Sequence, residues 1–208
     1  MQITKLVHSC LLIKEAGKII LIDPGNYTFE ENALDLNSIP ILDYILITHE
    51  HQDHMHIPLI KEIVQKFPTV KIISNDSVAG ILRNEGITVD TQSDQLIQLE
   101  TIPHDKNFMG PTVPNTIFTI SGRLTHPGDS HHFTKTAEIL SLPVQAPWGS
   151  TSNAVELATN LKPKVIIPIH DWHWNEKARV NIYKRLEDYF EKSGIRFIGL
   201  QTGVEAEV

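Results

Sequence analysis

The most informative part of this 208-residue sequence reads Tyr44-Ile45-Leu46-Ile47-Thr48-His49-Glu50-His51-Gln52-Asp53-His54. A continuous apolar run, which predicts a strand buried on both faces, leads directly into three histidines and an aspartate. Imidazole and carboxylate groups together suit zinc, iron or manganese. The spacing therefore favours a cradle for two metal ions, and the alternative is a histidine-rich surface loop.

The composition is that of a soluble globular protein, with 41% hydrophobic residues, 21% charged residues and a formal net charge of −7. The length suffices for one domain with a substantial core, and we expect residues 1–208 to form a single domain. The chain has no run of Lys or Arg, which argues against binding to a nucleic-acid backbone without excluding a small nucleotide.

Cys10 is the sole cysteine, so no intrachain disulfide can form and a reducing compartment suits the chain. Its apolar neighbours favour a buried, unreactive thiol. The first residues lack the pattern of a signal peptide, and no apolar run is long enough to cross a bilayer. We therefore expect a cytoplasmic protein that does not associate with membranes.

Short strands and helices alternate along the chain. Strands are expected at 2–7, 10–14, 18–22, 44–47, 70–74, 96–102, 116–120, 123–125, 165–169 and 196–200, and a further one is expected to start at Val144. Helices are expected at 57–67, 76–85, 133–140 and 176–193, and from a cap at Ser152 to Leu161. The strands form two groups, each followed by helices, which predicts two packed sheets with helices outside.

Four of these strands end near residues that commonly bind metals. The strand at 44–47 leads to the histidine motif, and the later strands lead to His104, Asp129 and His170. Loops that follow neighbouring strands of a rigid sheet can lie close together and form one site. A single histidine is more often a structural hydrogen-bonding residue, so the assignment depends on several groups that converge.

Together these segments resemble the metallo-β-lactamase superfamily, in particular small stand-alone metal-dependent hydrolases related to the ascorbate-phosphate lactonases. The likeness spans nearly the whole chain and rests, in the family's order, on His8-Ser9-Cys10, Ile22-Asp23-Pro24, the histidine motif, Ile102-Pro103-His104, Pro127-Gly128-Asp129-Ser130 and residues 162–170. The resemblance implies an α/β fold, a four-layer αββα sandwich of two packed mixed β-sheets with helices on the outer faces. The histidine motif is highly specific, whereas the flanking segments are individually weak.

The resemblance also implies roles for single residues. One metal ion is expected on His49, His51 and His104, a second on Asp53, His54 and His170, and Asp129 is expected to bridge them. The two ions are divalent, with zinc as the first expectation and manganese or iron as alternatives. Asp23 resembles a carboxylate that orients a ligand imidazole, and a simple turn-forming role is the equal alternative. His8 is a candidate proton donor or substrate contact.

The other histidines are expected beside the site and not as ligands: His56, His126, His131, His132 and His173. Trp148, Trp172 and Trp174 are expected near the pocket mouth, either to pack loops or to stack on substrate. The lead-in Thr125-His126-Pro127 and the segment 105–114 depart from the family's pattern, which leaves the local shape of the pocket open.

Two adjacent cations lower the pKa of water and yield a hydroxide nucleophile, with Asp53 placed to orient it and to accept a proton. Our leading hypothesis is hydrolysis of an ester, lactone or phosphoester bond in a small-molecule substrate. A di-iron or mono-iron oxidoreductase and an RNA or nucleotide phosphodiesterase are the alternatives, and a metal-stabilised protein without turnover is a further one. The sequence does not determine the native metal or the oligomeric state, and a homo-oligomer is possible.

Overall fold

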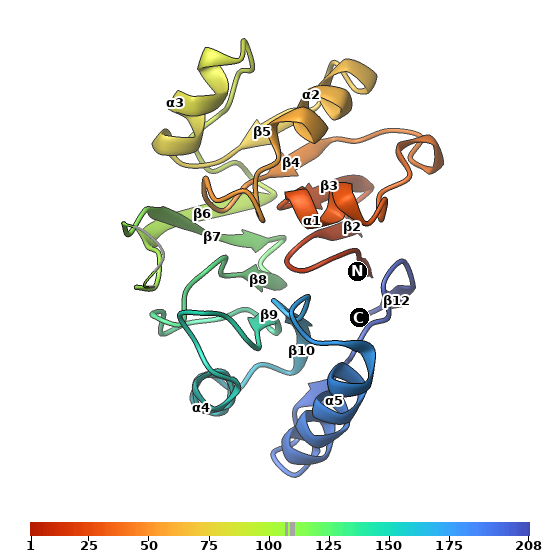
Figure 1. Cartoon of the computed structure of the whole chain (residues 1–208), viewed down its shortest axis with the longest axis vertical. Helices are drawn as coiled ribbons and strands as arrows, with labels where there is room; N and C mark the ends of the chain where they lie inside the picture. The colour runs from red at the N-terminus through yellow and green to blue at the C-terminus, as the bar shows by residue number, and fades with distance from the viewer. Residues whose placement is uncertain (107, 109–110) are drawn as a thin grey trace.

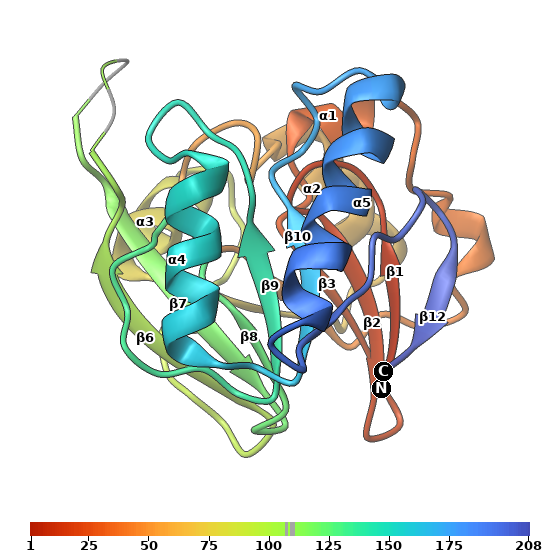
Figure 2. The same ribbon diagram turned by 90° about the horizontal axis from the view of Figure 1, so that it is seen from below.

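The computed structural model describes residues 1–106, 108 and 111–208. Two six-stranded sheets pack face to face, and helices cover their outer faces (Figure 1; Figure 2 gives the view from below). The strand orders are β12-β1-β2-β3-β4-β5 in the first sheet and β11-β10-β9-β8-β7-β6 in the second. The expected αββα sandwich is confirmed.

The first sheet is mixed. Its antiparallel part comprises β12 (Glu205–Glu207), β1 (Gln2–Lys5), β2 (Leu11–Glu15) and β3 (Lys18–Ile22). Its parallel part adds β4 (Tyr44–Leu46) and β5 (Lys71–Ile73). A short helix α1 (Asn26–Glu30) and a 3₁₀ turn (Leu36–Ser38) connect β3 to β4. The strand that precedes the histidine motif therefore lies inside the sheet, between β3 and β5.

The second sheet is also mixed. An antiparallel meander contains β6 (Ile97–Pro103), β7 (Pro114–Ile120) and β8 (Leu124–His126). Parallel strands then follow in β9 (Ile139–Pro143), β10 (Val165–Ile169) and β11 (Arg196–Phe197). The ends of β6, β8 and β10 carry the three remaining ligand-type residues of the sequence, so both sheets contribute to the site.

Three apolar cores separate the four layers. Helices α2 (Ile57–Lys66) and α3 (Asp76–Asn84) pack on the first sheet through residues such as Ile60 and Leu82. The core between the sheets contains Phe118 and neighbouring aliphatic side chains. Helices α4 (Thr151–Leu161) and α5 (Glu176–Glu191) pack on the second sheet, where Phe190 is fully buried. Burial of these apolar surfaces is the main force that holds the layers together.

One helix expected from the sequence is wrong. The stretch 133–140 is not helical, and its last two residues begin β9, whose five residues are all buried between β8 and β10. A strand covered on both faces shows no alternation of apolar and polar residues, so its sequence pattern is hard to distinguish from that of a buried helix. Val144 consequently follows a strand and does not start one, and its N–H donates to the Ile169 carbonyl.

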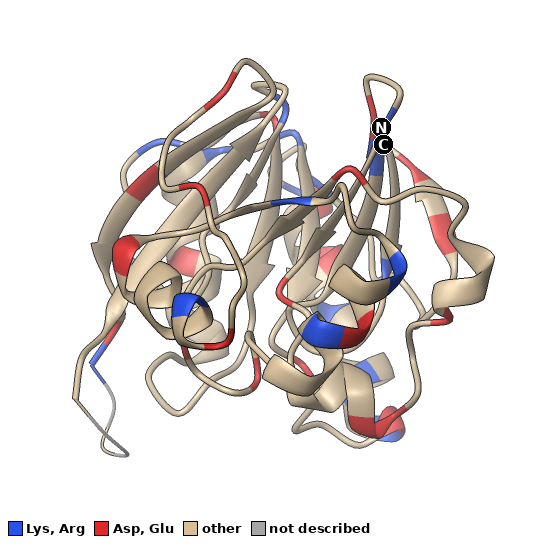
Figure 3. Cartoon of the chain, turned by 90° about the horizontal axis from the view of Figure 1, so that it is seen from above, with Lys and Arg blue, Asp and Glu red and all other residues tan. Residues whose placement is uncertain are grey.

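Smaller differences concern the ends of elements. Helix α4 is capped by Ser150 and not by Ser152, because the Ser150 hydroxyl accepts from the Asn153 N–H. The sequence does not predict α1, the 3₁₀ turn Leu36–Ser38 or β12, because these three elements are too short to show a clear pattern. None of the described helices combines the length and the hydropathy needed to span a bilayer. Figure 3 shows Lys and Arg interspersed with Asp and Glu along the ribbon.

Candidate metal centre

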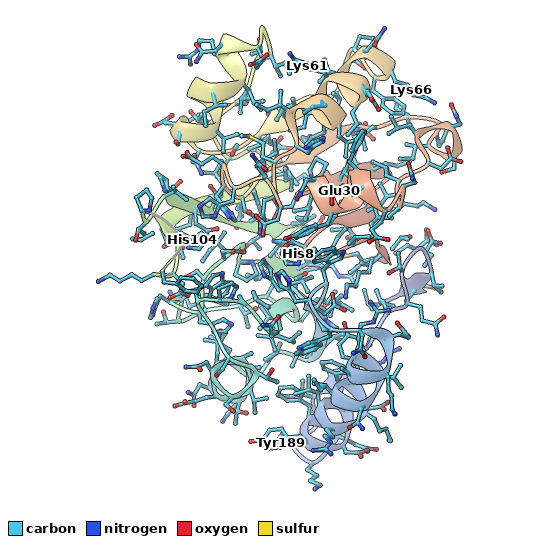
Figure 4. All side chains as sticks on the ribbon, viewed as in Figure 1. His8, Glu30, Lys61, Lys66, His104 and Tyr189 are labelled. Atoms are coloured by element: carbon cyan, nitrogen blue, oxygen red, sulfur yellow. The ribbon has the colours of Figure 1, made fainter. Side chains whose placement is uncertain are left out.

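The ligand-type residues of the sequence meet at one end of the two sheets. His8 follows β1, Asp23 follows β3, and the histidine motif follows β4, all in the first sheet. His104, Asp129 and His170 follow β6, β8 and β10 of the second sheet. His8 and His104, labelled in Figure 4, lie in the middle of that view, between the α2–α3 layer and the α4–α5 layer.

Three histidines form the first group. The ligand atoms of His49, His51 and His104 all lie within 4.8 Å of one another. His49 is fully buried, and its Nε2 is 3.1 Å from Nδ1 of His51. These are the three residues expected to hold one metal ion, and the structure brings them together.

Asp129 lies between this group and the second one. Its Oδ2 is 3.2 Å from His104 Nε2 and 4.0 Å from His49 Nε2. Its Oδ1 is 2.6 Å from His170 Nε2 and 3.0 Å from His54 Nε2. Each oxygen of the carboxylate therefore faces a different set of imidazoles, which is the placement expected of a bridging ligand.

The second group differs in composition from the expected one. Nε2 of His54 is 3.1 Å from Nε2 of His170, and the group of three histidine ligand atoms within 4.8 Å of one another that contains both is completed by His8, whereas Asp53 is not part of that group. Oδ2 of Asp53 lies 3.8 Å from His54 Nε2 and 3.2 Å from His8 Nε2. Asp53 thus lies beside the group and contacts two of its imidazoles, those of His8 and His54.

The donor set fits metal ions. Four tetrahedral ligand atoms about 2.0–2.1 Å from a zinc ion are separated by about 3.3 Å from one another, close to the two nitrogen–nitrogen distances of 3.1 Å. Oδ1 of Asp129 is buried and has no hydrogen-bond partner, because its short contacts to two imidazoles lack hydrogen-bond geometry. A buried carboxylate oxygen of this kind normally has a partner, and a cation supplies one.

Electrostatics favour a cation as well. Burial and the nearby His54 lower the pKa of His49 well below its usual value. Burial alone would also lower the pKa of His54, but neighbouring carboxylates, with Asp129 first, raise it well above the usual value. Burial alone would raise the pKa of Asp129, but His170 and His54 hold it well below the usual range. The buried carboxylate of Asp129 therefore stays ionised and stabilises a positive charge on His54, at a place where a bound cation could replace that proton.

Three residues near the cluster have an unusual backbone conformation. His8, Asp23 and His170 have φ angles of 60°, 48° and 66°, in the left-handed region that residues other than glycine seldom adopt. The His170 N–H donates to the His8 carbonyl, which ties two of these residues together across the sheets. Such conformations cost energy and concentrate at functional sites, where the surrounding structure maintains them.

Asp23 contacts a ligand-type imidazole directly. Its Oδ1 accepts from the Thr48 N–H at 2.8 Å, and its Oδ2 accepts from the Thr48 hydroxyl at 2.9 Å. The same Oδ2 is 2.7 Å from His54 Nδ1, so Nε2 of His54 is left to face the cluster. The carboxylate therefore fixes the orientation of the imidazole, and Asp23 also forms the turn that follows β3.

Replacing Asp23 with Asn tests this contact. We expect metal affinity to fall about 10- to 100-fold, the usual cost of losing an outer partner of a ligand histidine. The measurement is a titration with a competing chelator. Asp35→Asn is the matched control, because Asp35 is an exposed aspartate that caps the 3₁₀ turn. Equal affinities of the two variants would contradict the role of Asp23.

Two glycines allow the loops of the cluster to approach each other. A Cβ atom on Gly25 would lie 1.9 Å from the Asp53 carbonyl oxygen, which is backbone and cannot move aside. Gly128 has a φ of +58°, and its Cβ would lie 2.1 Å from Oδ1 of Asn115. That amide oxygen accepts from the Asp129 N–H at 3.0 Å, so Asn115 helps to position the loop. Asn115 was not among the expected site residues, because no motif in the sequence marks it.

Gly25→Ala is therefore expected to lower the free energy of unfolding by about 1–3 kcal/mol, the usual cost of overpacking. Gly80→Ala is its control, because Gly80 lies within α3 and a methyl group at that position would meet nothing within 4 Å. That change is expected to stabilise the helix by about 0.5–1 kcal/mol. Chemical denaturation of the metal-free proteins measures both values, and equal stabilities would rule out the predicted clash.

The remaining histidines lie outside the three clusters of ligand atoms. His126 is buried with Nε2 3.1 Å from the Ser9 carbonyl, and His131 has Nε2 3.0 Å from the Pro143 carbonyl. His132 pairs with Asp105 at 2.6 Å, and His56 packs against Phe29.

The three tryptophans differ in their surroundings. The Trp148 indole N–H donates to Asp129 Oδ2 at 2.8 Å. Trp172 stacks on Tyr27, with ring centres 3.8 Å apart, and Trp174 packs in the core of the second sheet. Packing therefore explains Trp174, whereas Trp148 and Trp172 lie near the cluster.

A buried ion pair lies directly beside His170. The Lys5 ammonium is 2.6 Å from Oδ2 of Asp171, and the Tyr183 hydroxyl donates to the same oxygen at 2.5 Å. Both charged side chains are almost completely buried. Burial lowers the pKa of Lys5, and Asp171 opposes that effect. These contacts link β1 and α5 to the residue after His170, and no sequence pattern indicated them.

A cavity of about 410 Å³ opens onto the cluster. Side chains of the cluster form part of its wall, including those of Asp53 and Asp129. The rest of the described lining comes from Asn26, Tyr27, Gln52, Pro147, Trp148 and His173. The volume is that of a small-molecule site.

The two-sheet sandwich and the histidine–aspartate cluster define a class of protein, the metal-dependent hydrolases of the metallo-β-lactamase superfamily. The chain belongs to the family described as the beta-lactamase superfamily domain, whose profile matches residues 2–170. The resemblance found in the sequence is thereby confirmed.

Individual relatives and a solved structure are similar to this chain over most of its length. Protein Rv0786c of Mycobacterium tuberculosis is 27% identical over 201 residues, which cover 90% of this chain and 92% of that protein. A UPF0173 metal-dependent hydrolase of Thermoplasma volcanium is 27% identical over 186 residues, which cover 78% of this chain and 80% of the relative. Igni18, a metallo hydrolase from Ignicoccus hospitalis, has the same fold, with a TM-score of 0.72, 18% identity and coverage of 100% and 98% of the two chains.

Proposed function

We propose that this metal-dependent hydrolase uses two divalent metal ions to cleave an ester, lactone or phosphoester bond of a small molecule. Zinc is the first candidate for both ions. The observation that carries the proposal is the position of Asp129, whose two carboxylate oxygens face two different sets of imidazoles. A single carboxylate between two groups of donors is suited to hold two cations close together. The adjacent cavity gives a small molecule access to them.

Each of the two metal ions would be held by its own set of residues. His49, His51 and His104 would hold one ion. His54 and His170 would hold the other together with Asp53, whose Oδ2 lies 3.8 Å from His54 Nε2, while His8 of the same group would act through its contact to Asp53. Asp129 would belong to both ions. Bound divalent cations supply Lewis-acid polarisation of the substrate and lower the pKa of the attacking water. Two buried metals also account for the concentration of carboxylates at this place.

Asp53 and His8 provide the proton-handling groups. The Asp53 side chain is 28% exposed and lines the cavity, where its carboxylate can orient a water molecule and accept its proton. His8 is nearly inaccessible, and its Nε2 lies 3.2 Å from Oδ2 of Asp53. With a proton on Nε2, His8 would donate to the carboxylate and keep the other oxygen turned toward the cavity.

The test compares Asp53→Asn with the parent protein on p-nitrophenyl esters, lactones and phosphodiesters after loading with zinc. We expect hydrolysis to fall by about 10²- to 10⁴-fold, the usual contribution of a general acid or base. Asp188→Asn is the control, because Asp188 is exposed on α5 and pairs with Lys184. Hydrolysis that is unchanged in Asp53→Asn would contradict the proposed role of this carboxylate.

Metal analysis of the protein from its native host decides between hydrolysis and redox chemistry. Zinc or manganese without oxygen uptake supports a hydrolase, whereas iron with oxygen uptake supports the oxidoreductase alternative. The cytoplasmic location, the lack of nucleic-acid binding and the formation of a homo-oligomer stay predictions.

A further inference from the structure

Two large aromatic side chains, Tyr27 and Trp148, line the cavity. The Trp148 ring lies 5.7 Å from the His170 ring, and the His170 ring lies 3.9 Å from that of His8. The His8 ring is 5.2 Å from that of Tyr27, which stacks on Trp172. Tyr27 and Trp148 are therefore linked by ring contacts through His8 and His170, and of these four rings all but the buried His8 line the cavity.

The aromatic side chains at both ends are held in place. The indole N–H of Trp148 donates to Asp129, and its ring lies 5.0 Å from the ring of His131. Tyr27 and Trp172 stack almost parallel, with an angle of 10° between their planes. Aromatic faces fixed in advance lose little conformational freedom when they bind another flat ring.

The charges around the cavity are negative or titratable. Among the described residues, no Lys or Arg lines it, whereas Asp53 and Asp129 do. At the Tyr27 end, the Asn26 amide donates to Glu30 at 3.0 Å, and the Trp172 N–H points to Glu31 at 3.4 Å. An anionic group on a substrate, unless it binds the metal ions themselves, would meet carboxylates here and no fixed cation.

We infer that the substrate carries, beside its reacting bond, an uncharged planar ring that binds against Tyr27 and Trp148. The inference rests on the proposed hydrolase function for the reacting bond and adds the class of the remaining part. Stacking on aromatic faces explains the preference for a flat ring over a saturated one of equal size. Glu30 and Glu31, which lie beside the Tyr27 end and are not assigned to the metal ions, explain the preference for an uncharged ring over an anionic one.

Binding of three non-hydrolysable probes to the zinc-loaded protein tests the inference. The probes are 2-naphthamide, its saturated decahydro analogue and 6-carboxy-2-naphthamide, measured by calorimetry at about pH 8.5, where an ordinary histidine is neutral. We expect 2-naphthamide to bind about fivefold more tightly than either of the other two. Tighter binding of the saturated probe, or tighter binding of the carboxylated probe to the zinc-loaded and the metal-free protein alike, would overturn the inference.

Single substitutions test which side chains cause the preference for the flat probe. Tyr27→Leu and Trp148→Leu are expected to remove most of the preference for the flat probe, whereas Trp148→Phe, which keeps a ring, is expected to retain it. Glu31→Gln is expected to improve binding of the carboxylated probe alone. The control is Tyr189→Leu, because Tyr189 is half exposed on α5, far from His8 and His104 in Figure 4, and it should change no affinity.

The outcomes separate this inference from the proposed function. Binding of the probes requires no turnover, so a protein that prefers 2-naphthamide but hydrolyses nothing would refute the hydrolase proposal and leave the ring site standing. A protein that hydrolyses esters but keeps its probe preference in both Leu variants would refute the ring site alone.

Discussion

Replacing Asp129 with Asn is expected to remove at least one of two bound metal ions and to reduce hydrolysis by more than about 100-fold. The amide keeps the size of the side chain but loses the charge that lies between two groups of imidazoles. Loss of a partner that only supports a ligand already costs about 10- to 100-fold in metal affinity, so loss of a shared ligand should cost more. Elemental analysis of the purified protein, together with rates on the best substrate of the ester and phosphodiester panel, measures both effects.

The control for this variant is Asp105→Asn. Asp105 is also buried near His104, but its carboxylate accepts from the His131 N–H and pairs with the exposed His132. We expect both metal ions to remain bound in that variant. Two ions retained in Asp129→Asn would show that the two groups of imidazoles do not share this carboxylate.

The largest expected effect on stability comes from Lys5→Met. The change leaves the Asp171 carboxylate buried without its ammonium partner, and breaking a buried pair in this way costs about 3–5 kcal/mol. Urea denaturation of the metal-free proteins gives the free energy of unfolding. Because Asp171 follows His170, metal affinity should fall as well, and a chelator titration measures it.

Two further variants test whether the loss of stability comes from the unpaired buried charge. The double variant Lys5→Met with Asp171→Leu is expected to recover part of the stability, because no buried charge is left unpaired. Lys14→Met removes an ion pair to Glu205 whose two side chains are 47% and 39% exposed, and it should cost less than about 1 kcal/mol. Equal losses for Lys5→Met and Lys14→Met would contradict the importance of burial.

Much of the site could be predicted because its residues follow strands with a strong sequence signal. An apolar run such as 44–47 is readily recognised, and the histidines directly after it need little further structure to meet. The sheet then brings His104, Asp129 and His170 to the same end. The two-sheet fold could be predicted from the order of the elements, because two groups of strands, each followed by helices, are compatible with few arrangements of layers.

Other features depend on contacts between distant parts of the chain, which a single sequence does not reveal. Tyr27 lies on a helix of five residues that follows β3 of the first sheet, and it stacks on Trp172, which follows β10 of the second sheet. Lys5 and Asp171 are buried together although either residue alone would be expected at the surface. The start of β9 resembles a helix in sequence because its neighbours, and not its own pattern, determine its conformation.

The division of the cluster between the two sheets has a consequence for folding. His49, His51 and His54 belong to one sheet, whereas His104, Asp129 and His170 belong to the other, so neither half of the chain can form the centre alone. A folding intermediate with undocked sheets would expose the histidine motif without its counterpart. Binding of two metal ions is therefore expected only after the two sheets have docked.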